Sequence, residues 1–327
     1  MAMDRNFALE AVRVTEAASL AAARHLGRGD EHAADTAAAR AMAEALSALE
    51  IDGTIRVGEG DDMVEALHIG TAVGNGEGPK IDVALRPLEG TSIIARGGYN
   101  AISVIALAER GGFLSVPDVY MNKVAVGPGL PEGICDITAD PADIVANVAG
   151  AKGLPIGDLV VCILDRPRHK DLIAKVRGVG ARIQLILDGD VSGALATMFN
   201  GDGADLFLGI GGAPQGVLAA AGLRCGGGQM QGKLVIRSDA DVTSLQEAGI
   251  EDPDAILGIE DMASGDVTFA ATGVTNGPLL QGVTRQNDHL ITQSLVLRSK
   301  TGTWRKIEAH HSQTTLEGRQ PKGDGTA

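Results

Sequence analysis

The stretch Ile81-Asp82-Val83-Ala84-Leu85-Arg86-Pro87-Leu88-Glu89-Gly90-Thr91-Ser92 joins a short apolar run to a polar turn. The apolar run, residues 81–85, is typical of a buried strand. Pro87 cannot donate to a strand ladder, so the chain is expected to leave the sheet there. The next residues place a carboxylate, a glycine and two hydroxyls at a strand end, which is a common way to build a phosphate or metal site. An ordinary polar turn gives the same pattern, and this stretch alone does not separate the two.

Composition limits the class of protein and of partner. The chain has 327 residues, of which 44% are hydrophobic, enough for one large domain or two ordinary ones. Aromatic residues make up only 2%, so stacking platforms for bases are scarce. The net charge of −14 argues against nucleic acid and against an anionic membrane surface. A small phosphorylated molecule can still bind if arginines or metal ions are focused locally.

The cysteines and the hydropathy pattern indicate the compartment. Cys135, Cys162 and Cys225 are odd in number and lack metal-ligand spacing, which fits reduced thiols in the cytoplasm. No run of about 18 apolar residues is present, and the N-terminus has no signal-like apolar core. A globular cytoplasmic protein is therefore expected.

Hydrophobic periodicity predicts the elements of the first half. Helices are expected at residues 5–26, 33–49 and 141–151, and strands at 54–57, 81–85, 101–108 and 119–126. A short linker at 153–157 suggests an N-terminal domain over 1–154 and a C-terminal domain over 155–311. The polar residues 312–327 are expected to be a disordered tail.

Two acidic features stand out in this half. Gly58-Glu59-Gly60-Asp61-Asp62 places three carboxylates within four residues, which repel one another unless they face a cation or open solvent. Asp35 lies in the first turn of the second predicted helix, where a favourable interaction of its carboxylate with the helix dipole is the simpler role.

The second half alternates strand and helix. Strands are expected at 159–164, 182–187 and 205–208, with helices at 169–179, 191–199 and 213–223. Three such units predict a parallel sheet that binds ligands at the carboxyl ends of its strands. Those ends carry Arg166–His169, Asp188–Asp190 and Gly209–Pro214. The arginines can fork onto phosphate oxygens, the aspartates suit sugar hydroxyls, and a glycine loop opening a helix can cradle phosphate. A helix at 241–249 and strands at 267–271 and 290–297 complete the chain.

Several motifs, in this order and spacing, resemble the class II fructose-1,6-bisphosphatases, including the forms that also cleave sedoheptulose-1,7-bisphosphate. The motifs are Gly27-Arg28-Gly29-Asp30, Ala33-Ala34-Asp35, Gly58-Glu59-Gly60, Pro87-Leu88-Glu89-Gly90-Thr91, Pro117-Asp118-Val119-Tyr120-Met121, Pro167-Arg168-His169, Asp188-Gly189-Asp190 and Gly209-Ile210-Gly211-Gly212-Ala213-Pro214. The resemblance spans nearly the whole chain. It implies an α/β fold, a layered α/β sandwich of the metal-dependent, lithium-sensitive sugar-phosphatase superfamily. It also implies a homo-oligomer that hydrolyses a sugar 1-phosphate with Mg²⁺ or Mn²⁺.

The same resemblance assigns site residues by position. A first metal ion would be held by Asp35 and Glu59, and a second by Glu89 with two further acids. Catalytic roles would fall to Thr91, which helps orient the attacking water, and to Glu59 and Asp62. Substrate would be met by Glu89, Gly90, Thr91, Tyr120, Arg166, Pro167, Arg168, Asp188, Gly189, Asp190 and Gly212.

The departures from the family pattern fall on the chemistry. Arg86 stands where the family has an aspartate and Gln215 where it has a glutamate, and both are second-metal ligands in that pattern. Glu31 replaces an expected lysine, and the loop at Gly58–Gly60 is about one residue short. Three interpretations stay open. The protein is a one-metal phosphatase in which Arg86 clamps charge, a catalytically silent protein that binds sugar phosphates or supports an assembly, or an enzyme retuned to another phosphorylated substrate. A sugar phosphatase is favoured because the substrate-side residues are all present.

Overall fold

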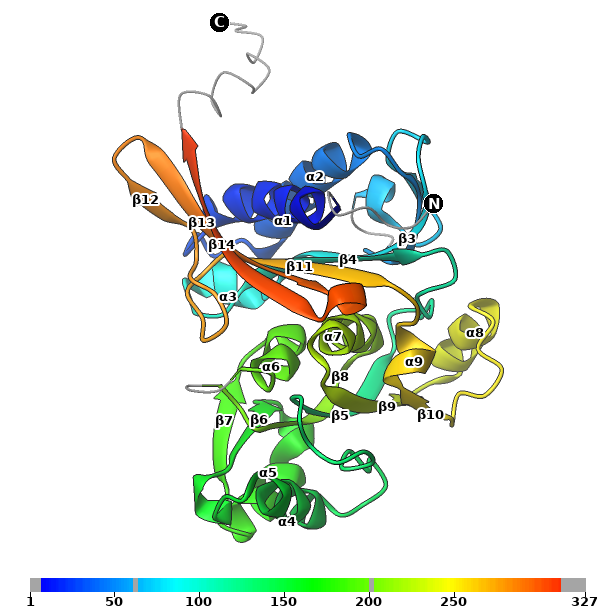
Figure 1. The fold of residues 1–327 in the computed structure, drawn as a ribbon, viewed down its shortest axis with the longest axis vertical. Coiled ribbons are helices and arrows are strands. Elements are labelled where there is room, and N and C mark those ends of the chain that lie inside the picture. Colours follow the sequence, from blue (N-terminus) through cyan, green and yellow to red (C-terminus); the bar gives the residue numbers. More distant parts are fainter. Residues whose placement is uncertain (1–6, 61–63, 200–202, 313–327) are drawn as a thin grey trace, which may run out of the picture.

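Residues 7–60, 64–199 and 203–312 are described by a computed structural model of the chain. Two β-sheets alternate with three layers of helices (Figure 1). In order across the molecule the layers are α1 (Phe7–Ala23) with α2 (Glu31–Ser47), the first sheet, α6 (Asp190–Ala196) with α7 (Ala213–Gly226), the second sheet, and α4 (Pro141–Lys152) with α5 (Lys170–Gly178). The expected α/β class is confirmed, as a mixed α/β protein with two mixed sheets.

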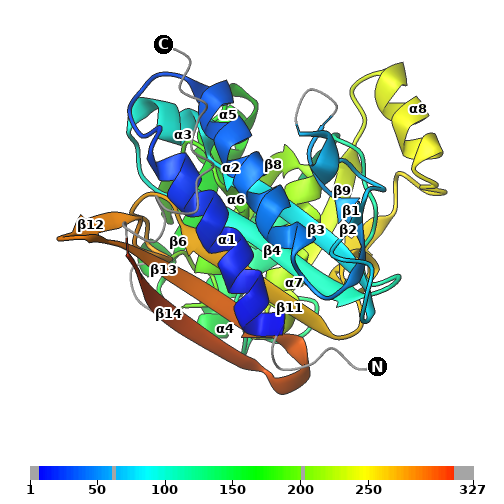
Figure 2. The same ribbon diagram turned by 90° about the horizontal axis from the view of Figure 1, so that it is seen from above.

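The first sheet has the strand order β12-β13-β11-β4-β3-β1-β2. Strand β14 lies outside this linear order and pairs with β13. These strands are β1 (Asp52–Val57), β2 (Ala72–Val73), β3 (Lys80–Glu89), β4 (Ile102–Glu109), β11 (Val267–Gly273), β12 (Thr284–Gln286), β13 (His289–Arg298) and β14 (Thr303–Ser312). Only β1 and β3 run parallel in it. Helix α1 crosses the outer face of this sheet beside α2 (Figure 2).

The second sheet has the order β10-β9-β5-β8-β6-β7. Its strands are β5 (Tyr120–Val126), β6 (Val160–Leu164), β7 (Arg182–Ile186), β8 (Leu206–Gly212), β9 (Gln229–Val235) and β10 (Ile256–Gly258). The predicted parallel arrangement holds for β6 with β7 and β8. Strand β5, which belongs to none of the three predicted strand–helix units, is antiparallel to both β8 and β9.

The second sheet is one continuous insertion into the first. All of its strands lie between β4 and β11, which are neighbours in the first sheet. The sheets therefore do not divide at the boundary expected near residue 154, because β5 precedes it and β11–β14 follow it. The rest of the expected tail, residues 313–327, lies outside the described residues, whereas Ser312 ends β14.

Three hydrophobic cores fill the spaces between the layers. The outer one joins α1 and α2 to Val83, Leu85 and Leu107 of the first sheet. The middle one surrounds α7 between the sheets, and the third joins α4 and α5 to the far face of the second sheet. Strand alternation sends Ala84 to the middle core while its neighbours face the outer one. Layers of this kind hold the strand ends rigidly, which positions the site.

The sequence predicted that β3 would end at Pro87, but the strand does not end there. It continues to Glu89, with a register shift between Arg86 and Glu89 opposite β4. Two residues of β3 thus face one residue of β4, which is a β-bulge, a position where a strand tolerates proline. Gly90, at φ 99°, then turns the chain into α3 (Thr91–Arg96), a helix that periodicity missed.

The longer helices agree with the sequence predictions to within a few residues at each end. Asp30 caps α2, because its carboxylate accepts from the Ala33 amide at 2.9 Å. The remaining helices are α8 (Asp239–Glu247) and the short α9 (Ile259–Met262). Within the described residues, no helix combines the length and apolar character needed to cross a membrane.

Candidate active site

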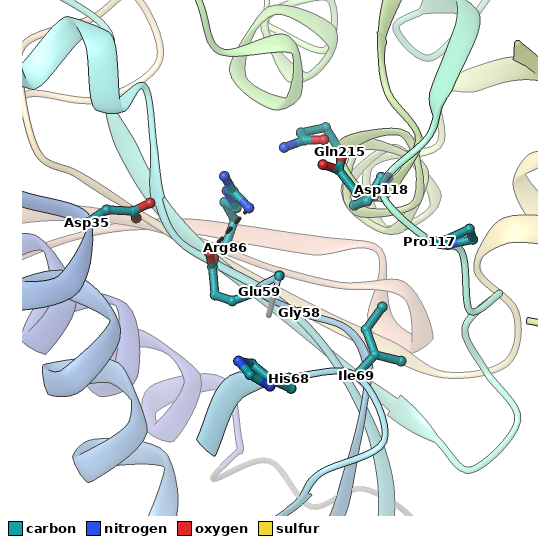
Figure 3. A pocket seen from close by; sticks show the side chains of 11 residues that line it. Asp35, Gly58, Glu59, His68, Ile69, Arg86, Pro117, Asp118 and Gln215 are labelled. Atoms are coloured by element: carbon teal, nitrogen blue, oxygen red, sulfur yellow. Dashed lines mark hydrogen bonds and ion pairs between the residues drawn. The ribbon is translucent and has the colours of Figure 1, made fainter. Parts of the chain in front are cut away.

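A cavity of about 650 Å³ gathers acids from separate elements around one arginine (Figure 3). We call it the Arg86 cavity, lined by Asp35, Gly58, Glu59, Gly60, His68, Ile69, Arg86, Pro117, Asp118, Pro214 and Gln215. Asp35 lies in the second turn of α2, Glu59 follows β1, and Gln215 lies in the first turn of α7. The end of β1, the bulged β3 and the chain entering β5 thus converge at one opening.

Arg86 is the central cation of this cavity. Its Nη1 lies 3.4 Å from Glu59 Oε2, and in Figure 3 its side chain lies between Asp35 and the pair Asp118 and Gln215. Partial burial works to lower the pKa of Arg86, yet the nearby carboxylates, Glu59 first among them, raise it overall. The guanidinium therefore stays charged at any relevant pH.

Glu89 ends β3 in a buried position behind Arg86. One carboxylate oxygen accepts from the Val191 amide at 2.8 Å, and the other, Oε2, is buried without a hydrogen-bond partner. Burial and the neighbouring Asp190 raise the pKa of Glu89 to about 8, against the lowering effect of the Val191 amide and Lys123. Glu89 does not line the Arg86 cavity itself.

The donor set of the cavity fits only one of the two metal ions that the family resemblance implies. Among the described residues, no group of three or more His, Cys, Asp or Glu is placed to hold an ion. The second position does not fit, because Arg86 offers no lone pair and Gln215 is neutral. The residues of the first position have the right chemistry for a hard cation, because Asp35 and Glu59 both offer carboxylate oxygens to one cavity. Water or phosphate oxygens can serve as the further ligands of such an ion.

The predicted arginine segment forms a short turn after β6. Arg168 donates from Nε and Nη2 to the Ile210 carbonyl, at 3.0 and 2.7 Å, and its Cζ lies 4.8 Å from the centre of the Tyr120 ring. Pro167 starts the turn, and Arg166 donates to the Asp165 carbonyl at 3.2 Å. Arg168 is thus brought against Tyr120, the first residue of β5.

His169 fixes this turn, a role that the sequence did not reveal. Its Nε2 accepts from the Ile210 amide at 2.8 Å, so Nδ1 carries the proton and donates to the Leu164 carbonyl at 2.7 Å. Burial lowers the pKa of His169 and keeps it neutral. The histidine therefore ties the end of β6 to β8.

The acidic segment after β7 lies against the start of α3. Asp188 accepts from Ser92 Oγ at 3.3 Å and from the Gly189 amide at 2.9 Å. Burial raises the pKa of Asp188, and the nearby Asp190 adds to that effect. This contact brings Thr91, the first residue of α3, toward the Asp188–Asp190 segment.

The glycine run at 209–212 is a strand rather than the expected loop, because these residues belong to β8 and pair with β5. Its glycines make room for a buried ion pair. Lys123, with 1% of its side chain exposed, donates to Asp190 Oδ2 and, at 2.9 Å, to the Gly212 carbonyl. A Cβ at Gly211 would lie 1.9 Å from that carboxylate oxygen.

The predicted residues thus fall into two neighbouring groups. Asp35 and Glu59 share the Arg86 cavity, while Tyr120, Arg168, Gly212 and Asp190 lie along the strand ends of the second sheet. Asp62 lies outside the described residues. The sequence did not reveal the contributions of Asp118, His68, Ile69 and Lys123. Of these, only Asp118 carried a signal, since it lies in the quoted Pro117–Met121 motif.

The chain matches known proteins over nearly its whole length. The family described as "Bacterial fructose-1,6-bisphosphatase, glpX-encoded" matches residues 5–311. "Fructose-1,6-bisphosphatase 1 class 2" of Escherichia coli (strain K12) is 42% identical over 324 residues, covering 94% of this chain and 96% of that protein. "Fructose-1,6-bisphosphatase class 2" of Shigella flexneri matches with the same identity and coverage.

The matched family belongs to the sugar-phosphatase superfamily, which places this chain, with its two mixed sheets, in that superfamily. Within it, the chain belongs to the class II fructose-1,6-bisphosphatase family. The family comprises phosphoric monoester hydrolases of carbohydrate metabolism.

Proposed function

We propose that this protein hydrolyses the 1-phosphate of fructose-1,6-bisphosphate, or of sedoheptulose-1,7-bisphosphate, with one Mg²⁺ or Mn²⁺ and a low turnover. The observation that carries the proposal is the Arg86 guanidinium, held 3.4 Å from Glu59 among the acids of the cavity. Two family relatives are named for cleavage of fructose-1,6-bisphosphate. This chain keeps their substrate-side motifs but carries a fixed positive charge where a second ion would need acids.

In this proposal the chain's own groups do most of the positioning. A bound ion would be held by Asp35 and Glu59 and would supply charge neutralisation and a more acidic water. Arg86 places a positive charge beside the transferring phosphoryl group, as an arginine finger does. Thr91 orients the attacking water from the start of α3. Arg166, Pro167 and Arg168 receive the phosphate that is not cleaved.

The sugar between the two phosphates is met by the acidic segment and the strand ends. Glu89, Gly90 and Asp188–Asp190 offer acceptors for its hydroxyl groups, with Tyr120 and Gly212 at the rim. Asp190 is held in place by Lys123, and Asp188 by Ser92. We also propose a homo-oligomer in the cytoplasm, which sedimentation of the purified protein and fractionation of its host would test.

A second candidate is a protein that binds sugar phosphates without cleaving them. It is favoured by the Arg86–Glu59 contact itself, because an oxygen committed to a guanidinium is less available to a metal ion. Such a protein would keep the arginine rim and lose the chemistry.

Phosphate release from fructose-1,6-bisphosphate, with and without Mn²⁺, separates the two candidates. Hydrolysis that requires Mn²⁺ and is lost in Asp35→Asn supports the one-metal phosphatase. Tight binding of the bisphosphate without phosphate release would reject hydrolysis and support a protein that binds sugar phosphates without cleaving them. Neither binding nor release would reject both.

A further inference from the structure

The first sheet ends at β14, a long strand whose outer edge is open. Strand β14 has ten residues, and each of them has a partner in β13 without a register shift. Among the described residues no strand pairs with its other side, and Figure 2 shows β14 at the outside of the molecule. Such an edge presents a row of backbone N–H and C=O groups with which another strand can pair.

Strand β14 lacks most of the features that keep an edge strand from pairing. The opposite edge of the same sheet, β2, has only two residues, which leaves little to pair with. A proline or a bulge would also interrupt an edge, but β14 contains neither. What it carries instead is charge, at Arg305, Lys306 and Glu308. Charged side chains protect an edge unless the approaching strand neutralises them, so their order decides what can pair there.

Alternation places four exposed side chains of β14 on one face of the sheet. The ring of Trp304 lies 5.3 Å from that of Phe199, and the Nζ of Lys306 lies 5.8 Å from the centre of the same Phe199 ring. Glu308 and His310 follow on this face and contact each other at 2.9 Å. Within the part of the chain that the structure describes, neither Lys306 nor Glu308 has an ion-pair partner on another element.

The order of these charges is complementary to itself. Two copies of β14 that pair antiparallel are related by a two-fold axis perpendicular to the sheet, so one residue lies opposite its own copy. With Ile307 at the axis, Lys306 lies opposite the partner's Glu308, and Glu308 lies opposite the partner's Lys306. Opposite charges at such positions stabilise a strand pair, and like charges destabilise it. An axis at Arg305, Lys306 or Glu308 would instead place a charge against its own copy.

We propose that β14 pairs antiparallel with β14 of a second copy of this chain, with Ile307 at the two-fold axis, so that the two first sheets form one continuous sheet. The same register places Arg305 opposite the partner's Ala309, so no like charges meet. In strand addition, backbone hydrogen bonds supply the affinity and side chains the specificity. The inference rests on the homo-oligomer proposed above and adds its interface, and it does not depend on hydrolysis of any substrate.

The test exchanges the two charges in the full-length protein. Lys306→Glu places carboxylates opposite each other in both cross-strand pairs, and Glu308→Lys places ammonium groups there. Each single variant should therefore dissociate about tenfold or more readily than wild type, because two attractive pairs become repulsive. If the wild type is larger than a dimer, these variants should stop at half its mass. Fluorescence-detected sedimentation velocity over a concentration series measures both effects.

Mixing the two single variants gives the decisive measurement. In the mixed pair every contact joins a lysine with a glutamate, so Lys306→Glu and Glu308→Lys together should associate about as tightly as wild type. The variant that carries both changes should do so by itself for the same reason. Lys170→Glu, on the exposed start of α5, is the matched control and should associate normally.

A role within one chain gives a different result. Lys306 contacts Phe199 and Glu308 contacts His310, so a loss caused by those contacts would persist in the mixture and in the double variant. Urea unfolding of each variant checks that its fold is intact. A monomeric wild type would overturn this inference together with the proposed homo-oligomer. An oligomer that neither single change weakens, or a loss that mixing does not restore, would overturn the β14 pairing alone.

Discussion

The Arg86 guanidinium and the Glu59 carboxylate lie 3.4 Å apart, so a cation fixed to the chain stands among the acids of the cavity. Gln215, on the opposite side of that cavity, adds no charge (Figure 3). Glu89 is the third residue that the family pattern gives to the second ion, and even with its carboxyl group ionised the three positions carry no net negative charge. Such a set cannot offset the dehydration of a second divalent ion.

Restoring the acids should therefore restore a second ion. Arg86→Asp combined with Gln215→Glu is expected to bind two Mn²⁺ per chain instead of one, and to raise turnover at least tenfold if the second ion contributes more than about 1.4 kcal/mol. Each single change should fall well short, because ligands of one ion act together. Calorimetric Mn²⁺ titration and phosphate release measure both effects. Two ions already bound to the unmodified protein would contradict this account of Arg86.

The first metal position has its own test. The protein is expected to bind one Mn²⁺ through Asp35 and Glu59, and Asp35→Asn should abolish that binding because a neutral amide replaces a charged ligand. Asp143→Asn, on the exposed first turn of α4, is the matched control and should bind normally. If Asp35→Asn binds Mn²⁺ as well as the control does, the ion binds somewhere other than at Asp35.

The buried pair of Lys123 and Asp190 makes a prediction about stability. Lys123→Met leaves the Asp190 carboxylate buried without its cation, so it should cost about 3–5 kcal/mol of unfolding free energy. Lys123→Met combined with Asp190→Asn removes both charges and should recover most of that loss. Urea unfolding of both variants and of wild type measures the difference. A single variant as stable as the wild type would mean that the pair contributes nothing.

Glu16 provides a prediction about pH. It lies 8% exposed beneath β13, where its Oε1 accepts from Thr292 at 3.2 Å. Burial raises its pKa, so the folded state binds the proton more tightly than the unfolded state does. Stability contributed by this group is therefore present at low pH and is lost as pH rises above its ordinary pKa of 4.5.

Glu16→Gln keeps the acceptor oxygen and removes the charge. We expect it to raise the urea midpoint at pH 7 and to change it less at pH 4, where the wild-type carboxyl is largely protonated. The pKa of the neighbouring His311 is lowered, mainly by burial, which gives stability an opposite slope in both proteins. Comparing the two proteins at each pH removes the part of that contribution that does not depend on Glu16, whose Oε1 lies 3.9 Å from His311 Nε2. A Gln variant less stable than the wild type at pH 7 would contradict the sign.

Most elements could be predicted because their signal is local. The periodicity of α1 and of the apolar strands depends on nearby residues alone. The continuation of β3 past Pro87 could not be predicted, since a bulge depends on the partner strand β4. Likewise β14 is a largely exposed edge strand whose polar sequence resembles a tail.

The site divides in the same way. Motifs within one segment, such as Pro167–His169, were recognisable in the sequence and are brought to the rim. Lys123 was not found, because its role depends on Asp190, which only the fold places beside it. The glycines of β8 were noticed in the sequence but were interpreted as a phosphate-binding loop. In the structure, the absence of side chains there leaves room for a buried ion pair.

The insertion of one sheet into the other has a consequence for the chain during its synthesis. Strand β4 is almost wholly apolar and buried, and its partner β11 is made only after every strand of the second sheet. At ordinary translation rates that delay is on the order of ten seconds. Throughout it, the nascent chain on the ribosome presents one open, apolar strand edge, which is a template for aggregation. Any premature stop before β11 would leave that edge permanently open.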